Sequence, residues 1–503
     1  ETEIIRNADI YTGGFNAEYG GRISSIMDIT TRDGNTGGIK GRASVSPFMA
    51  KLLLEGPLMK PKELGDGSIS YILTGKHSYL DQTSKVLYPY IDTTGEGLPF
   101  GFTDLYGKIS FKGSNGSKFN LFGFNFKDHV NYKAVSDLSW NSYGVGSNFL
   151  LVPGTSKVLI EGKLSLSDYK LQLIEDNGQI RKSGINNFNF GFDFKYFIKE
   201  NELKYGIEVS GFSTDFSYVN STKAKISQNE NTTELGTYFS YRIVKPRLVI
   251  EPSLRMQYYA TLKTLSPEPR LGLKYNIDEN FRVKFAAGIY SQNLISASSD
   301  RDVVNLFYGF LSGPDNLQTE FTDEEGNVRD VTHSLQKANH LIAGFEYDVT
   351  KKIHINVEGY YKRFTQLTNI NRNKIFNEDS DIDAPEILKK DYIVETGDAY
   401  GVDFVAKYSG KKTYLYAVYS LGKVTRWDGV RTYAPVFDRR HSVNLIGTYK
   451  FGKKQDWQVN ARWNFGSGLP FTQTQGYYQN ITFQDGSGTD ITQSNADELT
   501  AVY

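Results

Sequence analysis

The clearest candidate ligands for a metal ion are three aspartates at every second position, Asp379, Asp381 and Asp383. They lie in the acidic segment NEDSDIDAPE of residues 377–386. Hard cations such as Ca²⁺ bind several oxygen ligands, which carboxylates at this spacing can supply. The EF-hand pattern fails, because Ala384 stands where glycine is required and no glutamate follows at the twelfth position. We therefore expect a solvated loop, with a bound cation as the alternative.

Sequence patterns that would support catalysis are missing. There is no cysteine, which excludes disulfides and thiolate metal sites. No Gly-x-Ser-x-Gly elbow presents a nucleophilic serine, and no two histidines have ligand spacing on one element. We expect no enzyme activity and no cofactor, and we expect each histidine to be a hydrogen-bonded residue of the fold. The six histidines are His77, His129, His333, His340, His354 and His441.

An aromatic segment, VVNLFYGFL at Val303–Leu311, is the candidate binding loop for a ligand or partner. Val304, Phe307, Tyr308 and Leu311 recur at helical spacing and predict a short helix. Such a helix could offer an aromatic surface, since exposed apolar patches mark binding sites. The alternative, which we favour, is that this face packs on neighbouring loops.

A turn rich in glycine lies near the start of the chain, between the apolar stretches Ile4–Tyr11 and Ile23–Ile29. A phosphate-binding loop is disfavoured, because no Gly-Lys-Ser/Thr sequence follows and no long helix begins there. We expect the glycines to supply positive φ angles and close packing. The candidate residues of this turn are Gly13, Gly14, Tyr19, Gly20, Gly21 and Arg22.

The elements that must position these residues are predicted to be β-strands, because apolar and polar residues alternate with period two. In 188–196, Phe188, Phe190, Phe192 and Phe194 share one face, while Asp193 and Lys195 take the other. In 353–358, Ile353, Ile355 and Val357 oppose His354 and Glu358. Residues 281–289 show the same pattern. We expect the apolar faces to contact lipid and the polar faces to point inward.

Nineteen strands are predicted, and short turns between them alternate with long loops. The long loops include Asn293–Lys337, Asn369–Val394 and Asp428–Phe437. This alternation is typical of an outer-membrane β-barrel whose long loops face outside. No convincing strand is predicted in Asn480–Tyr503. The predicted strands lie near 38–47, 49–58, 68–79, 103–112, 117–127, 139–152, 156–173, 183–198, 202–217, 232–244, 246–262, 268–277, 279–292, 338–349, 351–368, 395–409, 412–427, 438–451 and 455–467.

The composition agrees with a barrel that has a wet interior. Hydrophobic residues make up only 39% and the mean hydropathy is −0.43, yet 34 tyrosines and 32 phenylalanines are present. The 57 basic and 57 acidic residues cancel, so no global field would attract nucleic acid. No apolar run approaches the ~18 residues of a membrane helix. Trp427, Tyr433, Trp457 and Trp463, near strand ends, are expected to form an aromatic girdle at the membrane interface.

The segment ETEIIRNADIYTGGFNAEYGGRISSIMDITTRDGN of residues 1–35 resembles the closing segment of the plug domain of TonB-dependent outer-membrane transporters. Further along, SPEPRLGLKY at Ser266–Tyr275, FRVKFAAGIYSQNL at Phe281–Leu294 and the segment His340–Leu367 resemble strand pairs of the same family. The approach to the last strands in the Bacteroidota-type subgroup is similar to FDRRHSVNLIGTYKF at Phe437–Phe451 and to WNFGSGLPFTQTQG at Trp463–Gly476.

The resemblance implies an all-β fold: a transmembrane antiparallel β-barrel of about 22 strands in the full protein, enclosing the end of a plug domain. Residues 1–37 would be the end of the plug domain, and residues 38–503 would form the barrel without its last strands. Arg22 and Asp28 would then face the lumen and pair with charges of the wall. A signal peptide and most of the plug are expected in a precursor, before Glu1.

The function implied by the resemblance is import of a nutrient across the cell outer membrane by energy-coupled displacement of the plug. Iron chelates, cobalamin, oligosaccharides and peptides are all candidate ligands. The expected partners are membrane lipid, a TonB-type protein that contacts a segment before Glu1, and a surface lipoprotein or another outer-membrane protein. The alternative is a receptor-like barrel that has lost transport and serves as a structural subunit of an assembly. Nucleic acid is not an expected partner.

Overall fold

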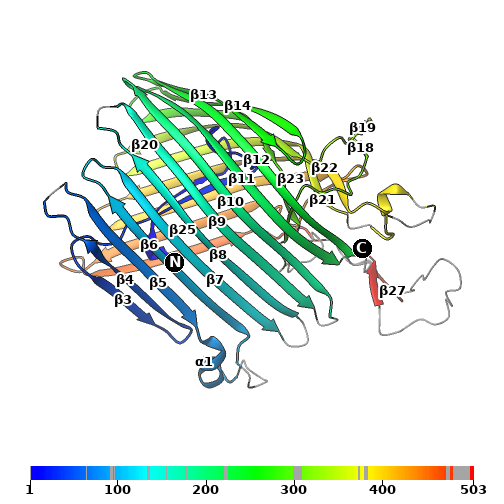
Figure 1. Ribbon diagram of the computed structural model, residues 1–503, viewed down its shortest axis with the longest axis horizontal. Coiled ribbons are helices and arrows are strands. Elements are labelled where there is room, and N and C mark those ends of the chain that lie inside the picture. Colours follow the sequence, from blue (N-terminus) through cyan, green and yellow to red (C-terminus); the bar gives the residue numbers. More distant parts are fainter. Residues whose placement is uncertain are drawn as a thin grey trace.

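The computed structural model describes residues 2–63, 65–90, 95, 97–132, 136–154, 156–175, 178–219, 225–297, 307, 309–371, 374–378, 383, 385–471, 476–479 and 499–502. One large antiparallel sheet forms a barrel that encloses a short hairpin (Figure 1). In the described part of the chain, no helix has both the length and the apolar character needed to cross a membrane.

The barrel is built from nineteen principal strands, which confirm the nineteen predicted windows. From β3 to β26 they follow one another as antiparallel neighbours, with the two-residue β24 (Thr432–Tyr433) beside β23. The strands are β3 (Lys40–Val45), β4 (Met49–Met59), β5 (Ser68–Ser78), β6 (Phe100–Lys112), β7 (Lys118–Tyr132), β8 (Ser136–Leu151), β9 (Val158–Glu175), β10 (Ile180–Ile198), β11 (Asn201–Val219), β12 (Lys225–Val244), β13 (Leu248–Tyr259), β14 (Thr264–Asn276), β15 (Phe281–Gln292), β20 (Gln336–Thr350), β21 (Ile353–Ile370), β22 (Tyr392–Ser409), β23 (Thr413–Trp427), β25 (His441–Phe451) and β26 (Trp457–Gly466).

The two faces of the strands differ as the alternation predicts. On β10, Phe188 and Phe190 are exposed on the outer face, at 42% and 39%. Asp193 points the other way and accepts a hydrogen bond of 2.6 Å from the buried Tyr238 hydroxyl. On β21, Glu358 binds the Lys284 ammonium at 2.6 Å inside the barrel. The wall therefore has an apolar outer surface and a hydrogen-bonded, charged lumen.

The four aromatic residues expected to form a girdle have different surroundings, and the girdle itself stays a prediction. Trp457 and Trp463 on β26 are exposed, at 67% and 54%. Trp427 instead donates its indole N–H to the Thr322 carbonyl at 2.8 Å, and Tyr433 donates to Glu395 at 2.7 Å. The polar atoms of these two half-buried side chains thus have hydrogen-bond partners in the protein, as those of Trp and Tyr usually do away from water.

The loop between β15 and β20 contains two small hairpins that the sequence did not predict. They are β16 (Leu294–Ala297) with β17 (Gly309–Ser312), and β18 (Glu320–Thr322) with β19 (Val328–Asp330). The helix predicted over Val303–Leu311 is therefore wrong from Gly309 onward. Val304 and Tyr308 lie outside the described residues.

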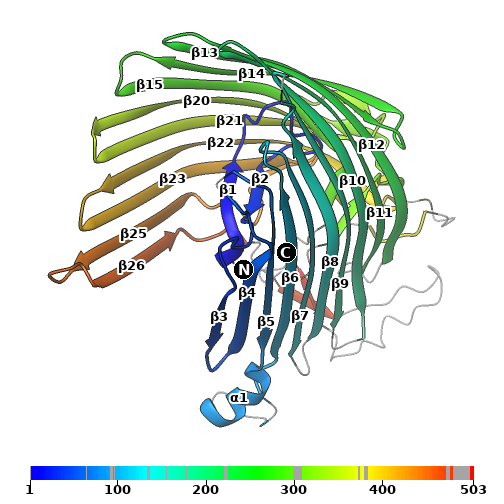
Figure 2. The ribbon, with the colours of Figure 1, turned by 60° about the vertical axis from the view of Figure 1, so that its left-hand side comes forward.

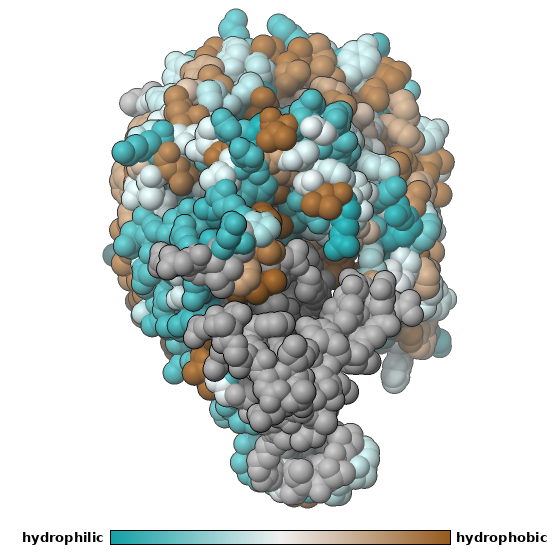
Figure 3. Space-filling model, turned by 90° about the vertical axis from the view of Figure 1, so that its right-hand side faces the viewer, coloured by the Kyte–Doolittle hydropathy of each residue, from teal (hydrophilic) through white to brown (hydrophobic). Residues whose placement is uncertain are grey.

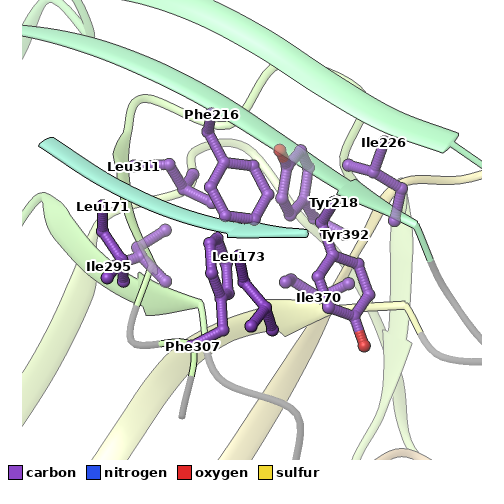
Figure 4. Close-up of a cluster of buried hydrophobic side chains, with 10 residues drawn as sticks. All are labelled: Leu171, Leu173, Phe216, Tyr218, Ile226, Ile295, Phe307, Leu311, Ile370 and Tyr392. Atoms are coloured by element: carbon purple, nitrogen blue, oxygen red, sulfur yellow. The ribbon is translucent and has the colours of Figure 1, made fainter. Parts of the chain in front are cut away.

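The mouth of the barrel has its own hydrophobic core, into which this loop folds (Figure 4). Phe307 and Leu311 are each 1% exposed and pack on wall residues such as Phe216. The Ser312 hydroxyl hydrogen-bonds to the hydroxyls of Thr214 and Thr232 at 3.2 and 2.9 Å. Strand pairing and burial outweigh the helical spacing here. The two described residues are packed, but mainly on barrel strands rather than on neighbouring loops as expected.

The remaining elements are small. A helix, α1 (Leu80–Leu87), lies in the loop between β5 and β6, and the one-turn helices η1 (Thr2–Ile4) and η2 (Glu386–Leu388) precede β1 and β22. The expectation that residues 480–503 lack a strand is wrong, because β28 (Leu499–Val502) pairs with β27 (Gly476–Gln479). Four-residue strands are too short to show a clear alternation. Hydrophilic and hydrophobic side chains mix over the loop end of the barrel (Figure 3).

The first residues form a hairpin inside the curved wall (Figure 2). Strands β1 (Ile5–Tyr11) and β2 (Ile26–Thr31) pair with each other and with no barrel strand among the described residues. We call residues 2–37 the inner segment, and the connection between its strands, residues 12–25, the glycine loop. Three ion pairs join the inner segment to the wall near its end: Arg32 to Glu55 at 2.5 Å, and Asp33 to Lys108 at 3.0 Å and to Lys118 at 2.8 Å.

Candidate functional site

The glycine loop has the backbone that its sequence predicts. Gly14 and Gly21 have φ angles of 63° and 66°, which side chains rarely tolerate. Gly20 instead lets the loop backbone lie close to the wall, because a Cβ there would be 2.0 Å from Nε of Arg255 on β13. At Gly13 a Cβ would lie 2.9 Å from the Ile342 side chain. The glycines thus let the loop lie directly on the wall.

Two buried arginines of the wall bind the loop through its carbonyl groups. Arg270 on β14 donates from Nη1 to the carbonyls of Asn16 at 2.5 Å, Tyr19 at 2.7 Å and Phe15 at 3.3 Å. Arg255 donates from Nη1 to the carbonyls of Ala17 and Glu18, both at 3.2 Å. These contacts depend on the backbone path of the loop rather than on its side chains.

Carboxylates fixed in the wall hold both arginines in place. Arg270 binds Glu268 at 2.6 Å, and their side chains are 2% and 0% exposed. Arg255, 1% exposed, binds Glu208 at 3.0 Å. A buried charge is tolerated only when it is paired and hydrogen-bonded. Each arginine therefore needs both its carboxylate and the loop carbonyls.

The other side of the glycine loop contacts β20 and β21. The His340 ring, through Nε2, is 2.9 Å from the Ile23 carbonyl. The Lys362 ammonium donates to the Ser24 carbonyl at 3.1 Å and also to that of Thr12. Phe15 packs on Tyr290, with ring centroids 4.5 Å apart, and the Arg270 guanidinium lies against both rings. With the ion pair of 2.8 Å between Lys204 of β11 and Glu18, six barrel strands together thus hold one short loop.

Two residues of the inner segment differ from expectation. Arg22 donates to the Gly21 carbonyl at 2.6 Å, and Asp28 accepts from the Tyr19 hydroxyl at 3.0 Å. Among the described residues, neither forms an ion pair with the wall, because each finds its partner within the segment. Burial and the nearby carboxylates of Glu18 and Asp28 raise the pKa of Tyr19, so its hydroxyl stays a protonated donor.

A cavity of about 760 Å³ lies against the glycine loop. Thr12 and Ser24 of the loop line it, together with Lys362 of β21, whose ammonium donates to the carbonyls of both. The opposite wall mixes charged and aromatic side chains. It includes Glu358, Tyr360, Phe364, Asp403, Arg426 and Phe437. Such a lining suits a ligand with both polar groups and an apolar surface.

Asp33 gives the attachment of the inner segment a defined pH dependence. Burial alone would raise the pKa of Asp33, but hydrogen bonds and charges from Lys118 and Lys108 outweigh it and lower that pKa from 3.8 to about 2. A lowered carboxylate pKa stabilises the fold above the unfolded value, and the contribution disappears as pH falls through the folded value. We expect Asp33→Asn to reduce stability at neutral pH and to flatten its acid dependence between pH 3.8 and about 2.

Acid titration of unfolding in detergent, followed by tryptophan fluorescence, measures this effect. Asp456→Asn, in the exposed turn before β26, is the matched control and should leave the profile unchanged. An Asp33→Asn profile that parallels the unsubstituted protein would contradict the assignment.

Comparison with known proteins supports the resemblance at the level of fold. Neither a family model nor a curated protein matches the sequence. Among solved structures, the alcaligin outer-membrane receptor FauA of Bordetella pertussis is similar over 93% of this chain and 75% of its own, with 12% identity and a TM-score of 0.62. The FrpB iron transporter of Neisseria meningitidis matches over 92% and 74%, with 12% identity and a TM-score of 0.64.

The ferric citrate transporter FecA is similar over 92% of this chain and 70% of its own, with 14% identity and a TM-score of 0.58. The chain has the fold of a TonB-dependent outer-membrane receptor. Its apolar outer face and alternating turn lengths agree with a location in the outer membrane. Membership of the Bacteroidota-type subgroup stays a prediction.

Sequence reasoning missed the wall residues that hold the glycine loop, namely Arg255, Arg270, His340 and Lys362. One signal was available: Glu268 and Arg270 stand at alternate positions of a predicted strand, so both share the inward face. The aspartate segment is largely untested, because Asp379 and Asp381 lie outside the described residues and Asp383 is exposed. Within the described residues, no group of three or more potential ligands could hold a metal ion.

Proposed function

We propose that this receptor imports a nutrient ligand by energy-coupled displacement of a plug, of which residues 1–37 are the end and 38–503 the surrounding barrel. The observation that carries the proposal is the cavity bounded on one side by the glycine loop itself. A ligand in that cavity touches the part of the protein that must move. A TonB-type protein, acting on a segment before Glu1, would supply the energy.

Lys362 links ligand binding to the loop. Its ammonium lines the cavity and at the same time donates to the Thr12 and Ser24 carbonyls. An anionic group on the ligand would compete for this ammonium, because a charged acceptor binds it more strongly than a carbonyl does. Binding would then weaken one of the contacts that hold the loop. Carboxylate-bearing iron chelates and peptides fit this chemistry better than neutral oligosaccharides.

Uptake of labelled iron chelates, peptides, oligosaccharides and cobalamin by cells that produce the receptor tests the proposal. We expect one class to accumulate only while the proton-motive force is intact. Lys362→Met should reduce binding of that class by about tenfold, as expected when one charge-assisted hydrogen bond is lost. Lys407→Met, on β22 and outside the cavity, is the matched control.

Uptake that persists after the proton-motive force is collapsed would contradict energy coupling. If no class is taken up and the protein purifies in a fixed ratio with other outer-membrane proteins, the non-transporting structural subunit becomes the better account.

A further inference from the structure

Within the described part of the chain, four charged side chains line the cavity beside the glycine loop. Two of them already have a counter-ion in the wall. Oε1 of Glu358 is 2.6 Å from Nζ of Lys284, and Nη1 of Arg426 is 3.3 Å from the carboxylate of Glu395, which is 2% exposed. Because their charges are compensated by the protein, these two side chains offer little net charge to a ligand.

The other two charged side chains, Lys362 on β21 and Asp403 on β22, have no counter-ion among the described residues. The Lys362 ammonium donates to two carbonyls of the glycine loop. The half-buried Asp403 carboxylate accepts no hydrogen bond from any residue that the structure describes. A charge that is partly removed from water is stabilised by a partner of opposite sign. A ligand that carries both a cationic and an anionic group would supply the partner for each.

The strand register separates the two charges along the wall. Lys362 pairs with Ala399 on β22, and Asp403 stands four residues further along that strand. At about 3.3–3.4 Å per residue, the two levels are roughly 13 Å apart. An extended peptide advances by nearly the same amount per residue. A peptide of about four residues therefore matches this separation, with its amine at Asp403 and its carboxylate at Lys362.

An aromatic side chain, Tyr360, lies between the two charges. It pairs with Gly401, midway between Ala399 and Asp403. A Cβ at Gly401 or at Gly422 of β23 would lie 2.7 or 2.9 Å from the Tyr360 hydroxyl, so the side chain extends across both glycines. The Lys362 ammonium is 5.9 Å from the centre of the Tyr360 ring. A ring at this level suits apolar side chains in the middle of a peptide.

We propose that the ligand of this cavity is a short peptide with free termini, about four residues long and apolar in its middle. Its ammonium binds Asp403, its carboxylate binds Lys362 and its central side chains pack on Tyr360. The inference rests on the proposed function, because it takes the same cavity as the ligand site. Among the candidate nutrients it selects peptides.

Calorimetric titration of the purified receptor with the peptide Ala-Phe-Phe-Ala tests the two charged contacts. We expect the N-acetylated and the C-amidated forms each to bind about tenfold more weakly, since each lacks one charge-assisted hydrogen bond. Acetylation should make no further difference to Asp403→Asn, and amidation none to Lys362→Met. The matched control, Asp398→Asn, lies on the outer face of the same strand and should keep both preferences.

Gly422→Ala tests the aromatic contact. The new methyl group would meet only the Tyr360 hydroxyl, so it should displace the ring without straining the backbone. We expect weaker binding of Ala-Phe-Phe-Ala and unchanged binding of Ala-Gly-Gly-Ala. Equal binding of the free and acetylated peptides by the unsubstituted receptor, or an undiminished preference for the free peptide in Asp403→Asn, would overturn the proposal.

The titration needs no proton-motive force, so it separates the ligand assignment from transport. Binding with the expected preferences but without uptake in cells would support the peptide assignment and contradict the proposed import. Energy-dependent uptake of another ligand class, together with no binding of Ala-Phe-Phe-Ala, would overturn the peptide assignment alone.

Discussion

Arg270→Met is expected to release the glycine loop from the wall and to destabilise the barrel by about 3–5 kcal/mol, the cost of leaving one partner of a buried ion pair uncompensated. The substitution removes three hydrogen bonds to loop carbonyls and leaves Glu268, 0% exposed, without its cation. Denaturant titration in lipid vesicles measures the stability. Hydrogen–deuterium exchange of residues 12–24 measures the release, which should appear as faster exchange there than in the barrel strands.

Two controls separate these effects. Arg363→Met breaks an ion pair with Asp398 in which the arginine is 38% exposed, and should cost no more than about 1 kcal/mol. Adding Glu268→Gln to Arg270→Met should recover part of the stability, because the unpaired charge is gone, but should leave the loop exchanging fast. Normal protection of residues 12–24 in Arg270→Met would refute the assignment of Arg270 as the main anchor.

Phe190→Arg is expected to destabilise the barrel by about 2–4 kcal/mol, the cost of a lipid-facing arginine near the bilayer midplane. Phe190 lies near the centre of β10, on the outer face, and is 39% exposed. The same denaturant titration in lipid vesicles measures the loss. Asn186→Arg, on the same face of the same strand but above the apolar belt, should cost much less. Equal losses at both positions would show that the apolar belt is not where the structure puts it.

The barrel strands could be predicted because each carries its own evidence. A long strand with lipid on one side and a polar lumen on the other must alternate, and Phe188 to Tyr196 does so whatever it pairs with. The short hairpins of the external loop carry no such evidence. The pairing of Ile295 with Leu311, like the burial of Phe307, depends on a hydrophobic core contributed by several barrel strands.

The candidate site was predictable only on one side. The sequence predicts that the loop needs its glycines for positive φ angles, and Gly14 and Gly21 do have them. It does not show what the loop touches, because Arg270 is 254 residues from Asn16 and Arg255 is 238 residues from Ala17. The arginines bind backbone carbonyls, which every residue type has, so the side chains of the loop do not reveal these contacts. Only the strand register brings these arginines to the level of the loop.

Movement of the glycine loop is the central claim, and cysteine labelling tests it most directly. The chain has no cysteine, so Ala17→Cys introduces a single one at a position that is 0% exposed. Val430→Cys, at an external position that is 82% exposed, is the control for reagent access. The measurement uses a membrane-impermeant maleimide on living cells supplied with the transported nutrient. We predict that Val430→Cys is labelled under all conditions, whereas Ala17→Cys is labelled only while the proton-motive force is intact. Labelling of Ala17→Cys that is the same with and without the proton-motive force would contradict energy-coupled displacement.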